Sequence, residues 1–126
     1  MILGVGVDLI EVERIQAVCE RHGDRFLRRV LCPAEIEYCR GFRMPGPHIA
    51  ARFAAKEAVS KAFGTGITGE LGWRDIEVAH QPSGQPYVIL HERGRALLAK
   101  RGARRLHLSL SHTQGHAVAV AVLEGD

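Results

Sequence analysis

The sequence HIAARFAAKEAVSKAF, residues 48–63, gives the strongest local signal in the chain. It is rich in Ala, Lys and Glu, which are good helix formers, and it contains neither Gly nor Pro. Gly64 follows directly, and a glycine in this position can take the left-handed conformation that ends many helices. The stretch therefore predicts a long helix over residues 48–63, preceded by a break at Met44–Pro47.

The chain before this helix is expected to begin with a buried strand over the first nine residues. Alternation places the apolar side chains of odd positions 3–9 on one face, and Gly4, Gly6 and Asp8 on the other. The two glycines leave room for a ligand or another backbone to approach closely. Helical spacing and turn residues then predict three shorter helices, over residues 12–22, 24–31 and 33–40.

The pattern changes to period two after residue 72, which predicts strands in place of helices. Four strands and one helix are expected in this half, with the strands at 73–79, 86–90, 106–111 and 117–123, and the helix at 91–101. Helices followed by a mostly antiparallel sheet predict an α+β fold in which the sheet packs on the long helix. The length suits one domain, residues 1–126.

The composition is that of a soluble globular protein, with 46% hydrophobic residues, 25% charged residues and a net charge of +3. Three cysteines form no CxxC pair, which favours neither a disulfide framework nor a zinc site. The apolar start MILGVGVDLI has no preceding basic residue and is too short to span a membrane. We therefore expect a cytoplasmic protein with no membrane partner.

Asp8, Glu57 and Lys61 are the first candidates for chemistry. Glu57 and Lys61 are four positions apart on the predicted helix and share one face, where they could form an ordinary surface pair. Asp8 could cap the first helix together with Glu11. Alternatively, Asp8 and Glu57 supply the one or two carboxylates that Mg²⁺ usually takes from a protein. The residues alone leave both interpretations open.

Two polar segments are typical of phosphate or base binding. Gly64-Thr65-Gly66 could turn backbone N–H groups toward a phosphate, although it lacks the Lys-Ser/Thr ending of a P-loop. SLSHT, residues 109–113, ends a predicted strand with polar side chains and lacks the G-x-S-x-G motif of a serine hydrolase. Binding therefore suits these segments better than nucleophilic attack.

Five segments occur together in an order that resembles a known family. They are GVGVDLIEVERI (4–15), RFAAKEAVSKAFGTG (52–66), WRDIEV (73–78), GQPY (84–87) and SLSHT (109–113). The chain resembles the bacterial holo-[acyl-carrier-protein] synthase family of 4′-phosphopantetheinyl transferases over essentially its whole length. This resemblance implies a homotrimer of α+β subunits with active sites between the subunits. It also implies transfer of the phosphopantetheine arm of coenzyme A to a serine of an apo-acyl carrier protein.

The resemblance also implies roles for individual residues. Asp8 and Glu57 would hold Mg²⁺ against the coenzyme A pyrophosphate, and Lys61 would neutralise charge on the leaving phosphate. The residues implied for coenzyme A binding are Arg52, Gly64, Thr65, Gly66, Pro86, Ser109, His112 and Thr113. The basic surface implied for the acidic carrier protein consists of Arg14, Arg21, Arg25 and Arg28. The group that deprotonates the carrier serine stays open between Asp8 and a metal-bound water.

Two departures from the family pattern concern substrate affinity. The loop 43–48 is rich in proline where relatives carry several basic residues, and Gln85 stands where Lys is common. Two other functions compete with the transferase: a different Mg²⁺-dependent pyrophosphate-cleaving enzyme, and a basic nucleic-acid-binding module. The second is disfavoured because the basic patches are small and the chain has only seven aromatic residues. We therefore expect no nucleic-acid partner.

Overall fold

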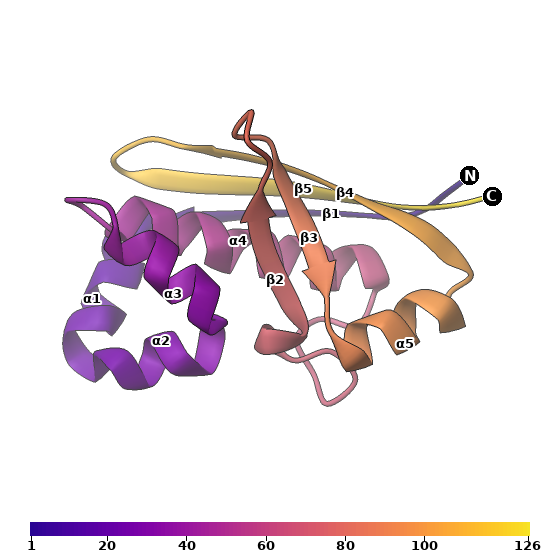
Figure 1. Ribbon diagram of the computed structural model, residues 1–126, viewed down its shortest axis with the longest axis horizontal. Coiled ribbons are helices and arrows are strands. Elements are labelled where there is room, and N and C mark those ends of the chain that lie inside the picture. The colour runs from indigo at the N-terminus through magenta and orange to yellow at the C-terminus, as the bar shows by residue number, and fades with distance from the viewer.

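The computed structural model describes residues 1–126 as an α+β arrangement, the fold class that the sequence predicts (Figure 1). The first half contains β1 (Ile2–Glu11), α1 (Val12–His22), α2 (Asp24–Val30), α3 (Pro33–Arg40) and α4 (Gly46–Phe63). The second half contains a 3₁₀ turn, η1 (Trp73–Asp75), then β2 (Ile76–His80), β3 (Pro86–Leu90), α5 (Glu92–Lys100), β4 (Ala103–His112) and β5 (His116–Gly125). No helix is long and apolar enough to span a membrane.

Two antiparallel sheets pack around α4. The larger has the strand order β1-β5-β4, and the smaller is the β2-β3 hairpin. Helices α1, α2 and α3 gather at one end of α4, whereas α5 lies at the other end (Figure 1). Alanines of α4, together with Ile49, Val59 and Phe63, are buried against both sheets and against the small helices, in two clusters that together hold most of the core. The long helix is therefore the central element of the fold.

Glycines of β1 allow this strand to lie directly on α4. An added Cβ would overlap the backbone carbonyl of Ala62 at Gly4 and that of Ala58 at Gly6. Only glycine fits at either position. The sequence predicted that a ligand or another backbone would approach these glycines closely, and the structure shows that it is the backbone of α4. Because the two elements touch here, Asp8, two residues further along β1, lies beside α4.

The prediction that β1 is buried is wrong for its apolar face. Val5, Val7 and Leu9 are 60%, 55% and 67% exposed, because the glycine face packs on α4 and the apolar face points to the opposite side of the sheet. These three side chains are in register with Val122, Val120 and Val118 of β5. We call this uncovered side, formed by β1, β5 and β4, the outer face.

Two element boundaries differ from the predicted ones. Helix α4 begins at Gly46, two residues earlier than predicted, because a proline is accommodated in a first helical turn. Residues Trp73–Asp75 form a 3₁₀ turn where a strand was expected, and the Asp75 carboxylate accepts a 2.8 Å hydrogen bond from the Gly72 N–H. The other predicted elements are present, with ends shifted by three residues or fewer.

A buried ion pair that sequence patterns did not reveal ties α3, α4 and β2 together. Lys56 and Glu35 are 0% and 1% exposed, and their charged groups lie 2.6 Å apart. The Glu35 carboxylate also accepts hydrogen bonds from the backbone N–H groups of Cys32 and Val78. Lys56 donates to the Val30 carbonyl as well. Burial lowers the pKa of Lys56, and the Glu35 carboxylate opposes that change.

Candidate active site

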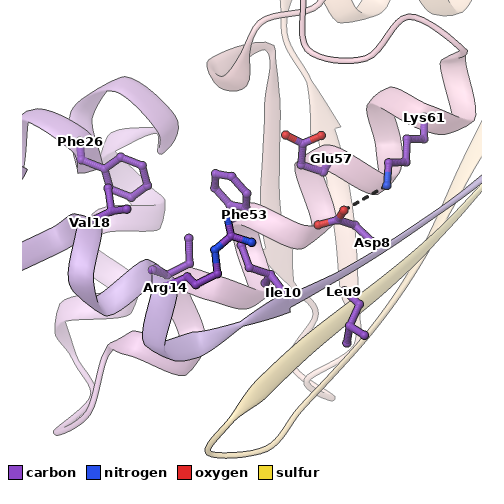
Figure 2. A pocket seen from close by; sticks show the side chains of 10 residues that line it. Asp8, Leu9, Ile10, Arg14, Val18, Phe26, Phe53, Glu57 and Lys61 are labelled. Atoms are coloured by element: carbon purple, nitrogen blue, oxygen red, sulfur yellow. Dashed lines mark hydrogen bonds and ion pairs between the residues drawn. The ribbon is translucent and has the colours of Figure 1, made fainter.

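Asp8, Glu57 and Lys61 lie together at one edge of the large sheet (Figure 2). Asp8 projects from the α4 side of β1, while its neighbour Leu9 points to the other side of the strand. The Lys61 ammonium donates a 3.1 Å hydrogen bond to Asp8 Oδ1 and a 3.0 Å bond to the Val7 carbonyl. Lys61 thereby fixes one oxygen of a carboxylate that is 17% exposed.

The three side chains line a cavity of about 420 Å³. Its remaining walls are Leu9, Ile10, Arg14, Ile15, Val18, Phe26 and Phe53. Burial raises the pKa of Glu57, the Asp8 carboxylate raises it further, and Lys61 opposes both. Two neighbouring carboxylates in one cavity form a favourable site for a hard divalent cation. The donor set therefore fits Mg²⁺.

Arg52 lies at the other edge of the sheet, in a second cavity of about 180 Å³. Its lining includes residues of α3, α4, the β2–β3 hairpin and β4: Tyr38, His48, Ala51, Arg52, His80, Gly84, Pro86, Leu110 and His112. The Arg52 guanidinium stands 4.1 Å above the Tyr38 ring, and the residue is 2% exposed. Its Nε has no hydrogen-bond partner. Such a buried, incompletely paired guanidinium favours an anionic ligand.

Three histidines surround this guanidinium. The His48 ring lies 5.0 Å from that of His112, and Nδ1 of His80 is 3.4 Å from an Arg52 nitrogen. Burial lowers the pKa of His48, and the neighbouring His112 and Arg52 lower it further. Burial and Arg52 likewise lower the pKa of His80. Both shifts favour the neutral form of these two imidazoles, which become better ligands for an anion when they take up a proton.

Comparison with known proteins identifies the family. A model described as the 4′-phosphopantetheinyl transferase superfamily matches residues 4–121. The chain belongs to this superfamily. A curated holo-[acyl-carrier-protein] synthase from Koribacter versatilis is 48% identical over 124 residues, covering 98% of this chain and 99% of the relative.

Solved structures agree with this assignment to the 4′-phosphopantetheinyl transferase superfamily. The holo-[acyl-carrier-protein] synthase of Neisseria meningitidis matches with a TM-score of 0.93 at 35% identity, covering 98% of this chain and 99% of that one. The Bacillus anthracis synthase, solved in complex with CoA (3′,5′-ADP), matches with a TM-score of 0.84 at 38% identity, covering 100% of this chain and 99% of that one.

The predicted site residues of this transferase-family chain fall into two groups. Asp8, Glu57 and Lys61 share the first cavity, which lies at the β1 edge. Arg52, Pro86 and His112 share the second, at the β4 edge. The two cavities have no lining residue in common, and the β1 and β4 edges are separated by β5. One chain therefore does not bring all the predicted residues into one site.

The other predicted ligand-binding residues line neither cavity. Ser109 lies on β4 at an exposed position opposite Val120 of the outer face. The Thr113 hydroxyl accepts hydrogen bonds from the Gly115 and His116 N–H groups, so it closes the β4–β5 turn. Gly64, Thr65 and Gly66 lie beyond the C-terminal end of α4.

The N–H groups of the Gly64–Gly66 bend are hydrogen-bonded within the chain, and the role of this bend in phosphate binding stays a prediction. The Gly64 N–H donates to the Lys61 carbonyl, and the N–H groups of Thr65 and Gly66 both donate to the Ser60 carbonyl. Gly64 and Gly66 have φ values of 81° and 67°, which allow the chain to fold back on the end of the helix. The bend therefore caps α4 with the donors that were expected to bind phosphate.

The two simpler interpretations of the first group are also wrong. Asp8 lies inside β1, and the residue that precedes α1 is Glu11, whose side chain forms no capping bond. Lys61 pairs with Asp8, not with Glu57 on its own helix. Glu57 therefore has no ion-pair partner within the chain, whereas Asp8 is paired with Lys61, and the shared-cation interpretation stays a prediction.

Proposed function

We propose that this chain transfers the 4′-phosphopantetheine arm of coenzyme A to a serine of an apo-acyl carrier protein and releases adenosine 3′,5′-bisphosphate. The observation that carries the proposal is the Asp8–Glu57–Lys61 group, found at one cavity of a chain that belongs to the phosphopantetheinyl transferase superfamily. Coenzyme A bound to the Bacillus anthracis relative supports the choice of substrate. The protein would act as a single domain over residues 1–126, in the cytoplasm.

In this mechanism Asp8 and Glu57 would hold Mg²⁺. The ion, when bound, neutralises charge on the pyrophosphate. Lys61 places its ammonium beside the same cavity, where it stabilises charge that develops on the departing bisphosphate. The carrier serine hydroxyl gives its proton to Asp8 or to a water and attacks the phosphorus that bears the pantetheine arm, and the P–O bond to the bisphosphate breaks. This chain therefore needs no nucleophile of its own, and the lack of a hydrolase motif is consistent with that role.

Incubation with coenzyme A, Mg²⁺ and an apo-acyl carrier protein tests the reaction. Intact-mass spectrometry should show the carrier serine gaining one phosphopantetheine arm, with the bisphosphate released in equal amount. Cleavage of coenzyme A without a mass gain on the carrier would favour a pyrophosphate-cleaving enzyme. Neither product, together with tight binding of nucleic acid, would favour the noncatalytic alternative.

The homotrimer is part of the same proposal. The outer face exposes Val5, Val7 and Leu9 of β1 and Val120 of β5, and such an apolar patch is typical of a subunit interface. A ring in which the β1 edge of one copy meets the β4 edge of the next would place the Asp8 cavity of one subunit beside the Arg52 cavity of its neighbour. The ring would thereby complete a site that one chain leaves divided.

Val7→Lys is expected to dissociate the trimer, because a charge on the outer face loses its hydration when the copies associate. Light scattering should report a trimer for the wild type and a monomer for the variant at low micromolar concentration. Ala99→Lys, which adds the same charge at an exposed position of α5, should remain trimeric. A trimeric Val7→Lys protein would place the interface elsewhere.

The carrier-docking surface is proposed on the exposed arginines Arg14, Arg21, Arg25 and Arg28 of α1 and α2. Since Arg14 also lines the Asp8 cavity, the cleaner test uses Arg21→Glu with Arg25→Glu. The double variant should raise the KM for carrier protein about tenfold or more and leave that for coenzyme A nearly unchanged, because charge reversal opposes an acidic partner. Arg95→Glu with Lys100→Glu on α5 is the charge-matched control. Equal effects of both pairs would contradict this surface.

Nucleotide binding is expected to take up protons at the Arg52 cavity. A bound phosphate raises the pKa values of His48 and His80, which burial and Arg52 hold below their usual value. The affinity for adenosine 3′,5′-bisphosphate should therefore rise as the pH falls from 8 to 6. Titration calorimetry of wild type and His80→Gln checks this, because the variant should show a shallower pH dependence. Identical slopes for the two proteins would contradict the role of His80.

A further inference from the structure

A cluster of Cys32, Glu77 and His91 lies apart from both cavities described above. A thiol sulfur, a carboxylate oxygen and an imidazole nitrogen from these residues lie within 4.8 Å of one another. They come from three segments: the residue before α3, the strand β2 and the residue before α5. Since these segments are far apart in sequence, cysteine spacing gave no sign of the cluster.

The cluster is buried at Cys32 and open to solvent at His91. Cys32 is 6% exposed, the Glu77 side chain is 16% exposed and the His91 side chain is 42% exposed. Nε2 of His91 lies 2.8 Å from Glu77 Oε1, so the imidazole and the carboxylate already face each other. An ion entering from solvent would meet His91 and Glu77 first and the buried sulfur last.

We propose that Cys32, Glu77 and His91 bind one Zn²⁺ ion, with a water molecule as the fourth ligand. Thiolate, imidazole and carboxylate are the three donor types that zinc takes from proteins, whereas Mg²⁺ and Ca²⁺ take oxygen donors. Ligands at tetrahedral zinc bonding distances stand about 3.3–3.7 Å from one another. The present separations therefore need only small side-chain movements.

The charges of the cluster also suit a divalent cation. A Cys32 thiolate and a Glu77 carboxylate together balance the two positive charges of zinc. Without an ion, burial raises the pKa of the Cys32 thiol to about 11; the nearby Lys56 ammonium lowers it, while Glu35 and Glu77 raise it. Zinc binding would therefore release the thiol proton.

The site would strengthen the same part of the fold as the buried ion pair. The Cys32 N–H donates to Glu35, and Val78, the residue after Glu77, donates to the same carboxylate. Zinc bound by the cluster would link three elements: β2, the N-terminal end of α3 and the N-terminal end of α5. The role is structural and independent of the transfer reaction, because none of the three residues lines the Asp8 or the Arg52 cavity.

Cobalt(II) is a specific spectroscopic probe of this site, because a thiolate bound to cobalt gives a charge-transfer absorption band that carboxylates alone do not give. The full-length protein, freed of metal and titrated with Co²⁺ in excess Mg²⁺, should develop this band with a stoichiometry of one. Added Zn²⁺ should abolish it and raise the melting temperature. Cys39→Ser is the matched control, because Cys39 is a buried thiol outside the cluster, and its variant should keep the band.

Cys32→Ser should lose the charge-transfer band and the melting-temperature increase with Zn²⁺. His91→Gln, at a half-exposed position that should not impair folding, should weaken Co²⁺ binding at least about tenfold. Absence of the band in the wild type would overturn the proposal. So would a band of equal strength and affinity in His91→Gln, which also decides the matter if Cys32→Ser does not fold.

Discussion

Glu57→Gln is expected to lower the turnover of carrier protein at least about a hundredfold, because it removes one of the two proposed metal carboxylates. The substitution keeps the size of the side chain, and Glu57 makes no ion pair within the chain, so the fold should be retained. Excess Mg²⁺ should restore little activity, since one carboxylate remains where two held the ion. Asp8→Asn should act in the same direction and also free Lys61.

Steady-state kinetics at saturating coenzyme A and a series of Mg²⁺ concentrations provides the measurement. Glu70→Gln is the matched control, because this exposed glutamate lies outside both cavities and should leave turnover unchanged. Melting temperatures of all variants separate lost chemistry from lost structure. Full activity in both Glu57→Gln and Asp8→Asn would remove the metal-site model.

Lys56→Met should lower the free energy of unfolding by about 3–5 kcal/mol, the usual cost of leaving a buried charge without its partner. Lys56 is 0% exposed, and its removal leaves the Glu35 carboxylate without the ammonium that lies 2.6 Å away. Chemical denaturation followed by circular dichroism gives the free energy. Since α3, α4 and β2 meet at this pair, the loss should affect the whole domain.

Two further variants make this stability prediction specific. Lys100→Met removes a partner of the exposed Lys100–Glu70 pair and should cost less than about 1 kcal/mol. Adding Glu35→Gln to Lys56→Met should recover part of the loss, because the uncompensated charge is then gone. A cost below about 1 kcal/mol for Lys56→Met alone would contradict the assigned role of the pair.

Local patterns predicted the elements well because each carries its own signal. The alanine-rich segment 48–63 and the helix end at Gly64 were predicted correctly, and the alternating segments form strands except at Trp73–Asp75, which is a 3₁₀ turn. Alternation alone could not tell which face of β1 is covered, since an apolar face suits a core and a subunit interface equally. Gly4 and Gly6 carried the decisive information, because only they allow contact with the α4 backbone.

The candidate site was predictable in part for a similar reason. Asp8, Glu57 and Lys61 stand in recognisable motifs, and the structure places them together. Tyr38, His48 and His80 were missed, although all three line the cavity around Arg52. They belong to separate segments with no motif of their own, so only the folded chain brings them to the guanidinium. The buried partner of Lys56 was missed for the same reason.

The proposed trimer joins the carboxylates of one copy and the Arg52 cavity of the next into one transferase site. Co-expression of Glu57→Gln chains with Arg52→Ala chains tests it, with phosphopantetheine transfer to the carrier serine read by intact-mass spectrometry. Each variant alone should be nearly inactive. Randomly mixed trimers should regain about a quarter of the wild-type sites, because each cleft then needs one intact half from each of two neighbours. Mixed trimers that remain as inactive as either parent would contradict the shared site.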